Sequence, residues 1–490
     1  MTYDFDPNFI ELVAAHLIDG ARVFDGEKLP VFRPSDGFET APIPIANEEI
    51  VDRAVTSAHR AFTTGEWRNA SPLDRAAVLH RWAALIDENR ERIARIEAAS
   101  TTRPVADLIN RDLVRASGAL RFFAEWADKI EGKIIAGNNS ATSMVRPEPY
   151  GVIAGIAPFN FPAINAIWKS APALAVGNSV VLKPSELTPY SALVFAELAL
   201  EAGLPKGVLN VMQGAGPSGS HLVRHPLVRK ITFTGSSATG ARVMADAAAT
   251  GTKPVTLELG GKSPQLVLKD VTDMDAVATN VANGFLANSG QVCTAGTRLI
   301  VPSSKSEDLL ERVMKIAAGR KAAPTWKSDC TLPPIISEKQ AKRIDDMLAQ
   351  TLADGAEIIC GGGRDASMNS GAYYQPTILR NVPETSTGFR DEFFGPILSV
   401  YEYEDEADGI AMTNHPSYAL AASVYTDDFN KAMRLPSQIE AGTVWVNAHG
   451  RQPDYATPQG GFNGSGFGKE MGRSGLESFL RFKNVWLHHG

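Results

Sequence analysis

The spacing of apolar positions along the chain changes near residue 150. From residue 46 to 130 apolar residues recur every three or four positions, as in Ala76 through Ile86, which predicts helices. Beyond residue 150, short β-branched or apolar runs alternate with helical stretches such as 190–203. The strands predicted in this part are 151–156, 179–182, 208–211 and 230–233. Alternating strands and helices are typical of a parallel, doubly wound sheet.

A second group of predicted strands begins at residue 265. It comprises 265–268, the runs around Leu299 and Val301, 399–401, 423–424 and 443–446. The expected fold class is therefore α/β, with two Rossmann-like, doubly wound lobes. Glycine is frequent between residues 455 and 473, which predicts backbone that packs closely against another part of the protein.

Length, composition and charge favour a folded multidomain enzyme. The chain has 490 residues, more than one ordinary core accommodates, and 44% of them are hydrophobic. The net charge of -7 comes without a basic stripe, which argues against nucleic-acid binding. No run of about 18 apolar residues occurs, and the first residues lack a targeting pattern. We therefore expect no membrane association and a cytoplasmic location.

Three cysteines occur, and one lies in a setting suited to chemistry. Cys293, Cys330 and Cys360 form no CxxC pair, which argues against a disulfide framework and against a metal site. Cys293 lies among small and polar residues between Asn288 and Gly296. An inert buried cysteine more often has bulky apolar neighbours. The open surroundings predict that a substrate carbonyl and backbone donors reach the Cys293 sulfur.

Polar residues follow one predicted strand of the first group. Lys183 and Glu186 come directly after residues 180–182, at the edge where doubly wound sheets bind ligands. This pair suits ribose hydroxyls, and Glu186 repels a 2′-phosphate, which favours NAD over NADP. The alternative is an ordinary strand-to-helix turn, with Ser185 or Glu186 near a helix start.

Two glycine-containing loops also follow predicted strands. Gly235 and Ser236 lie where backbone N–H groups and a hydroxyl suit a pyrophosphate, although Ser236 or Ser237 equally suits a helix cap. Residues 214–219 fit the GxGxxG pattern, but the acidic residue expected about twenty positions later is missing. This second loop is therefore a weak fingerprint by itself.

Six motifs, in this order, resemble the signatures of the aldehyde dehydrogenase superfamily and span most of the chain. They are Ala157-Pro158-Phe159-Asn160-Phe161-Pro162, the Lys183 motif, Phe233-Thr234-Gly235-Ser236, Leu257-Glu258-Leu259-Gly260-Gly261-Lys262, Gly290-Gln291-Val292-Cys293 and Glu392-Phe393-Phe394-Gly395-Pro396. The resemblance implies an enzyme that oxidises an aldehyde to a carboxylic acid. It also implies NAD as the cofactor, with NADP as the alternative.

The same resemblance implies catalytic roles. Cys293 is the expected nucleophile, giving a thiohemiacetal whose oxyanion is stabilised by the Asn160 amide and the Cys293 N–H. Glu258 is the expected general base for hydrolysis of the acyl thioester. Lys169 and Glu470 match positions expected to relay the proton.

The resemblance further implies a cofactor site and a substrate tunnel. The expected cofactor residues are Ile156, Ala157, Pro158, Phe159, Lys183, Ser185, Glu186, Gly216, Phe233, Gly235, Ser236, Leu259, Gly260, Glu392 and Phe394. The expected tunnel residues are Phe161, Asn165, Trp168, Thr294, His449, Arg451 and Gln459. Several of the tunnel positions are polar, which leads us to expect a polar or carboxylate-bearing aldehyde.

Alternatives of different classes remain at this stage. Phe159 stands where members of the family often carry Trp, and Phe is found there in CoA-acylating semialdehyde dehydrogenases. Those enzymes typically lack the general base that Glu258 supplies, so hydrolysis is favoured over CoA transfer. A cofactor-free thiol esterase would use the same Cys293.

The resemblance also implies a domain organisation. We expect a discontinuous NAD-binding domain (1–125 and 150–259), a catalytic domain (260–463) and an oligomerisation arm (126–149 and 464–490) with a final strand at 478–482. Because an exposed strand invites pairing with another subunit, we expect a homodimer or homotetramer.

Overall fold

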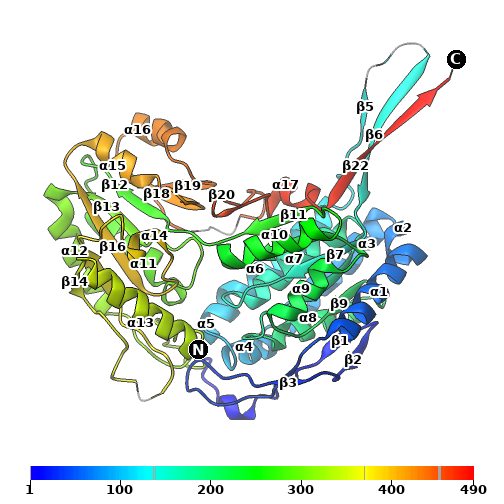
Figure 1. Ribbon diagram of the computed structural model, residues 1–490, viewed down its shortest axis with the longest axis horizontal. Coiled ribbons are helices and arrows are strands. Elements are labelled where there is room, and N and C mark those ends of the chain that lie inside the picture. The colour runs from blue at the N-terminus through cyan, green and yellow to red at the C-terminus, as the bar shows by residue number, and fades with distance from the viewer. Residues whose placement is uncertain (1, 136, 138–139, 369, 451–453, 490) are drawn as a thin grey trace.

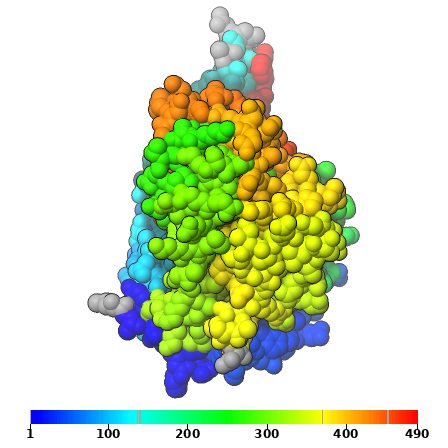
Figure 2. Space-filling view, turned by 90° about the vertical axis from the view of Figure 1, so that its left-hand side faces the viewer, coloured from blue at the N-terminus to red at the C-terminus, as the bar shows by residue number. Residues whose placement is uncertain are grey.

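The computed structural model describes residues 2–135, 137, 140–368, 370–450 and 454–489. Two α/β units lie side by side, and a long strand arm projects from one of them (Figure 1). The space-filling view shows the outer face of the second unit, with the arm standing above it (Figure 2). No described helix is long and apolar enough to cross a membrane.

The first unit is built on an eight-stranded sheet. Its strand order is β2 (Ala21–Val23), β1 (His16–Ile18), β9 (Leu209–Val211), β8 (Ser179–Lys183), β7 (Val152–Ile156), β10 (Val228–Thr234), β11 (Val255–Glu258) and β21 (Gly466–Phe467). The run from β9 to β11 is parallel. The four strands predicted between 151 and 233 are confirmed, and most of their side chains are buried because helices cover both faces of the sheet.

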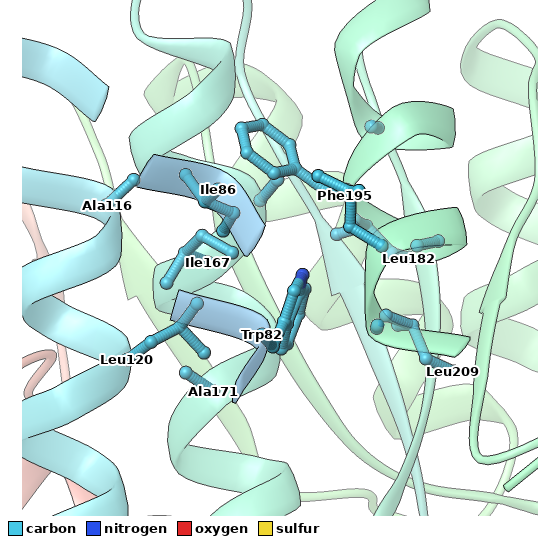
Figure 3. Close-up of a cluster of buried hydrophobic side chains, with 14 of the residues drawn as sticks. Trp82, Ile86, Ala116, Leu120, Ile167, Ala171, Leu182, Phe195 and Leu209 are labelled. Atoms are coloured by element: carbon cyan, nitrogen blue, oxygen red, sulfur yellow. The ribbon is translucent and has the colours of Figure 1, made fainter. Parts of the chain in front are cut away.

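Strand alternation separates two cores on opposite faces of this sheet. Ile153 and Leu182 face a core built from α3 (Pro72–Glu88), α6 (Leu113–Trp126), α7 (Pro162–Ala175) and α8 (Tyr190–Glu201). Trp82 of α3 and Phe195 of α8 pack there (Figure 3). Val152 and Val181 face the other core, with α1 (Glu48–Thr64), α9 (Gly216–Arg224) and α10 (Ser237–Ala249). The helices predicted between 46 and 130 are thereby confirmed.

The second unit contains a seven-stranded sheet. Its order is β14 (Glu357–Cys360), β15 (Thr377–Arg380), β16 (Ile397–Tyr403), β13 (Arg298–Pro302), β12 (Pro264–Val267), β18 (Ala421–Tyr425) and β19 (Thr443–Val446). All neighbours are parallel except β14 and β15. The helices of this unit are α11 (Met274–Leu286), α12 (Ser303–Ala318), α13 (Glu338–Ala353), α14 (Thr387–Arg390), α15 (Glu406–Thr413) and α16 (Phe429–Arg434). The predicted second group of strands and the α/β class are confirmed.

Short elements complete the chain. They are η1 (Pro7–Phe9), β3 (Lys28–Leu29), β4 (Ile43–Pro44), α2 (Glu66–Asn69), α4 (Arg90–Ala98), α5 (Val105–Asp107), η2 (Leu108–Asp112), η3 (Ala287–Gly290), β17 (Tyr418–Ala419), η4 (Leu435–Gln438), β20 (Phe462–Asn463) and α17 (Gly472–Glu477). The π-helical turn η2 joins α5 to α6. The glycines around 460–472 do pack closely, since a Cβ on Gly466 would lie 2.1 Å from the Leu257 carbonyl oxygen.

The arm is a three-stranded antiparallel sheet. It consists of β5 (Lys133–Ile135), β6 (Ala141–Pro149) and β22 (Leu480–His488), in the order β22-β6-β5. The prediction of a final strand at 478–482 was wrong in its bounds. Ser478 ends α17, where its hydroxyl bonds the Gly475 carbonyl at 2.7 Å, so the strand starts only at Leu480 and continues to His488.

The topology of the first sheet creates a natural binding edge. From β7 the chain proceeds outward to β8 and β9, then returns to place β10 on the other side of β7. Doubly wound sheets bind ligands outside the carboxyl ends of the strands where the order reverses. This point lies between Ile156, which ends β7, and Thr234, which ends β10.

Candidate active site

A cavity of about 1910 Å³ opens at this edge and extends to the second unit. The carboxyl ends of β7, β8, β10 and β11 contribute Asn160, Lys183, Ser236 and Glu258 to its wall. Cys293, from the segment between α11 and β13, lies in the same wall. Residues far apart in the sequence therefore meet in one space at the sheet's switch point.

The cavity collects most of the residues singled out from the sequence. Those in its wall are Ile156, Ala157, Pro158, Phe159, Asn160, Phe161, Asn165, Trp168, Lys183, Ser185, Glu186, Gly216, Phe233, Gly235, Ser236, Glu258, Leu259, Gly260, Cys293, Thr294, Glu392, Phe394, His449 and Glu470. Lys169 and Gln459 are not among the lining residues. Arg451 lies outside the described residues.

The segment before Cys293 has an unusual backbone. Asn288, Ser289 and Gly290 all have left-handed conformations, with φ of 48°, 53° and 72°. Gly290 also lies against the Gly395 carbonyl, where a Cβ would come within 2.0 Å of the oxygen. Non-glycine residues in this region carry strain, and such strain is often found at functional sites. The partly exposed Cys293 thus follows a tight, strained turn.

Asn160 and the turn before Cys293 are tied to each other by hydrogen bonds. The Asn160 side-chain amide donates to the Gln291 carbonyl at 3.0 Å. In return the Asn288 amide donates to the Asn160 carbonyl at 3.2 Å, and Thr102 donates to the Asn288 side-chain oxygen at 2.9 Å. Because an amide nitrogen has two hydrogens, Asn160 retains a second N–H for a ligand beside Cys293.

Glu258 ends β11 and is 5% exposed. Two glycines, which carry no side chain, allow Glu258 and the Cys293 backbone to pack closely against their neighbours. A Cβ on Gly460 would lie 2.8 Å from a Glu258 carboxylate oxygen, and one on Gly261 would lie 2.5 Å from the Cys293 carbonyl oxygen. Glu258 and Cys293 both line the cavity, each beside a glycine without a side chain.

Lys169 forms a buried ion pair with Glu470, which lines the cavity. Lys169 is 0% exposed, bonds the Glu470 carboxylate, and also donates to the Thr234 hydroxyl at 2.6 Å. Gln459, expected in the tunnel, instead holds Glu470 through two backbone hydrogen bonds of 2.7 and 2.8 Å. Burial, together with nearby Lys169, lowers the pKa of Lys230 on β10 to about 8.

Residues expected to bind the cofactor line the cavity, and two of them lie at the starts of helices. Lys183 lies 3.6 Å from the Glu186 carboxylate, and burial lowers the pKa of its ammonium. Ser236 caps α10 by accepting from the Thr239 N–H at 3.3 Å. Gly216 begins α9 with open space where a side chain would lie. Ser236 and Gly216 thus lie at the starts of two helices that face the cavity.

An aromatic pair and a carboxyl group lie farther along the cavity. The rings of Phe159 and Phe394 meet edge to face, 5.6 Å apart. Glu392 accepts from the Gly261 N–H at 3.3 Å, and burial raises the pKa of this carboxyl to about 8. Phe394 has φ of 54°, so the segment carrying both residues is held in a strained conformation.

His449 supports Thr294, the residue after Cys293. Its Nε2 lies 3.1 Å from the Thr294 carbonyl, which only accepts, so Nε2 carries the hydrogen and Nδ1 accepts from the Ser423 hydroxyl at 2.8 Å. Burial lowers the pKa of His449 to about 4. The imidazole is therefore neutral, and both of its ring nitrogens are hydrogen-bonded within the protein.

Several residues of the cavity wall were not predicted from the sequence. Arg103 stacks 4.5 Å over the Phe161 ring and bonds Asp112 at 2.7 Å. Arg115 and Tyr455 also line the cavity. A single arginine or tyrosine gives no signal by itself, and these three residues reach one cavity only in the folded protein.

The comparison with known families agrees with this geometry. The sequence pattern of the Aldehyde dehydrogenase family matches residues 23–485. The chain belongs to the aldehyde dehydrogenase family. A betaine aldehyde dehydrogenase of Cereibacter sphaeroides is 37% identical over 479 residues, covering 97% of this chain and 98% of the relative.

Solved structures of the aldehyde dehydrogenase family also resemble this chain. An indole-3-acetaldehyde dehydrogenase in complex with NAD+ has a TM-score of 0.96 and 34% identity, with 98% of each chain covered. A γ-glutamyl-γ-aminobutyraldehyde dehydrogenase from Burkholderia cenocepacia J2315 has a TM-score of 0.96 and 35% identity, covering 99% of this chain and 98% of that one. The fold expected from the sequence is thereby confirmed.

Proposed function

We propose that this NAD(P)-dependent aldehyde dehydrogenase acts through Cys293 as nucleophile and Glu258 as general base. The observation that carries the proposal is their presence in one cavity with the Asn160 amide, at the switch point of the first sheet. Family membership supports aldehyde oxidation as the reaction. The assignment of each residue to a step is our own.

The first step is addition to the aldehyde. Glu258 takes the proton of the Cys293 thiol, the resulting thiolate sulfur bonds the carbonyl carbon, and the carbonyl oxygen becomes an oxyanion. The second N–H of Asn160, with the Cys293 backbone N–H, stabilises this charge. The hydrogen bond from Asn160 to Gln291 fixes the amide in advance, so little reorganisation accompanies the reaction.

The cavity fits NAD beside the nucleophile. Lys183 and Glu186 suit the adenosine ribose, and the start of α10 with open Gly216 suits the pyrophosphate region. Phe159, Phe394 and Glu392 suit the nicotinamide side. NAD, when bound, supplies the hydride acceptor that makes the thiohemiacetal an acyl thioester. Glu186 favours NAD over NADP because it repels a 2′-phosphate.

Hydrolysis completes the cycle. Glu258 takes a proton from water, the hydroxide adds to the thioester carbon, and the carboxylic acid leaves the Cys293 sulfur. Lys169 and Glu470 carry the proton away through the wall, and Thr234 lies beside them. Because Glu258 supplies a general base for water, we expect hydrolysis rather than transfer of the acyl group to CoA. Formation of an acyl-CoA product when CoA is added would contradict this expectation.

Replacement of the nucleophile tests the proposal. Cys293→Ser should abolish aldehyde-dependent NADH formation, followed by absorbance, because an alcohol is a far weaker nucleophile than a thiolate. NADH accumulation at the parental rate would contradict it. Ester hydrolysis without NAD fits either this enzyme or a thiol esterase, so only NADH formation separates the two.

The arm supports a homodimer or homotetramer. Its strands expose large apolar side chains, among them Ile134 at 75%, Trp486 at 60% and Phe482 at 57%. Such side chains on an outer strand favour pairing with a second copy of the chain. Light scattering tests this by comparing the molecular mass of Trp486→Lys in solution with that of the parent. The domain division and the cytoplasmic location predicted from the sequence stay predictions.

A further inference from the structure

One part of the cavity wall carries more positive than negative side chains. We call it the tunnel mouth, and its charged members are Arg103, Asp107, Arg111, Asp112, Arg115 and Arg320. Both carboxylates are shared with arginines of the same group. Asp112 accepts from Arg103 at 2.7 Å, and Asp107 lies 3.5 Å from Arg103 and 3.8 Å from Arg111. Four cations against two anions leave two positive charges among these six residues.

Arg115 of the tunnel mouth lies on α6, which packs against α7. It is a partly buried residue of α6 and lines the same cavity as Asn165 and Trp168 of the neighbouring α7. Gly118, one turn later on α6, has the Tyr455 hydroxyl directly against it, since a Cβ there would lie 2.1 Å from that oxygen. Burial raises the pKa of Tyr455, and Arg115 counters this rise. The Arg115 guanidinium and the Tyr455 phenol therefore belong to the same stretch of the cavity wall.

We propose that the aldehyde carries a carboxylate at the end remote from its reacting carbon, and that Arg115 binds this carboxylate. The inference rests on the proposed function, because it assumes an aldehyde that travels past the mouth to Cys293. A guanidinium and a carboxylate form a strong charge-assisted hydrogen bond. The excess positive charge also raises the local concentration of anions.

The same charges disfavour a cationic aldehyde. A trimethylammonium group at the mouth would meet like charges in partly buried surroundings, where screening by salt is weak. The substrates named for the relatives do not decide the matter, because they include aldehydes of different charge. The tunnel mouth of this chain does, because its four arginines outnumber its two aspartates and act on whatever enters.

Three probes that share a four-carbon chain and differ in charge test the proposal on the full-length enzyme with NAD: 4-oxobutanoate, butanal and 4-(trimethylammonio)butanal. We expect kcat/KM in that descending order. Arg115→Met should lower kcat/KM for 4-oxobutanoate about 10- to 100-fold and leave butanal within about twofold. Arg121→Met is the matched control, since Arg121 lies on the same helix, pairs with Asp87 at 2.5 Å and does not line the cavity.

A second measurement needs no turnover. Succinate should slow alkylation of Cys293 by iodoacetamide in the parent and in Arg121→Met, and much less in Arg115→Met. The proposal is overturned if butanal equals 4-oxobutanoate, or if Arg115→Met lowers both by one factor. If none of the probes reduces NAD, the proposed function fails instead, and succinate protection still decides whether the mouth binds a carboxylate.

Discussion

Asn288 donates a hydrogen bond from its side-chain amide to the backbone carbonyl of Asn160, at 3.2 Å. The two residues come from different units, and Asn288 is 6% exposed. Its oxygen is held in turn by Thr102, so its orientation is fixed on both sides. The distance between Asn160, the proposed oxyanion donor, and the turn before Cys293 thus depends on a buried asparagine to which we assign no direct part in the chemistry.

Asn288→Ala should lower kcat by up to about 100- to 1000-fold, the range found when an oxyanion donor is lost, because the Asn160 backbone loses its support. NAD affinity should stay near the parental value, since the cofactor edge is not touched. Stopped-flow NADH bursts and NAD titration measure both quantities. Asn430→Ala is the control, because Asn430 is an exposed residue of α16 that does not line the cavity. An unchanged burst rate would show that Asn288 does not position Asn160.

Gly290 should tolerate no side chain. Its φ of 72° and the 2.0 Å approach of the Gly395 oxygen predict that Gly290→Ala displaces the turn before Cys293. We expect loss of more than about 2 kcal/mol of unfolding free energy, together with most of the activity. Gly363→Ala is the control, since nothing lies within 4 Å of the added carbon and φ is ordinary. Equal urea midpoints for the two variants would contradict this account.

Much of the architecture could be predicted from the sequence, for identifiable reasons. Buried parallel strands such as β8 and β18 read as continuous β-branched or apolar runs, so both sheets could be found. The final strand was misplaced because the residues before Leu480 end a helix through a contact of Ser478 that carries no local signal. Periodicity locates elements better than their ends.

The site could be predicted less completely than the sheets. Residues inside the six motifs, such as Asn160 and Cys293, were singled out because the motifs carry them. Gln459 was expected in the tunnel, but its backbone pairs with Glu470 and it does not line the cavity. Arg115 and Tyr455 were missed because they meet only when α6 packs against the segment around 455. Long-range packing of this kind has no signature within a single sequence window.

Glu186 should set the cofactor preference. Glu186→Ser removes the charge that repels a 2′-phosphate and leaves the Lys183 ammonium, 3.6 Å away in the parent, to attract it. We expect kcat/KM for NADP to rise about tenfold or more while that for NAD falls. Steady-state assays with both cofactors measure the ratio. Glu201→Ser, at the exposed end of α8, should leave it unchanged, and an unchanged ratio in Glu186→Ser would remove Glu186 from the cofactor site.

Lys262 should make stability depend on pH in the alkaline range. It is 2% exposed, donates to the Gly388 and Asp391 carbonyls, and burial lowers its pKa to about 7. Between about pH 7 and 10.5 the unfolded chain keeps the proton that the folded chain has lost, so the free energy of unfolding rises with pH, by at most about 1.4 kcal/mol per unit. Below pH 7 both states are protonated and the slope vanishes. Urea unfolding of the parent and of Lys262→Met across this range measures the difference, which should grow with pH. A difference that stays constant would mean that Lys262 keeps its proton in the folded protein, held by the same carbonyls that anchor the segment carrying Glu392.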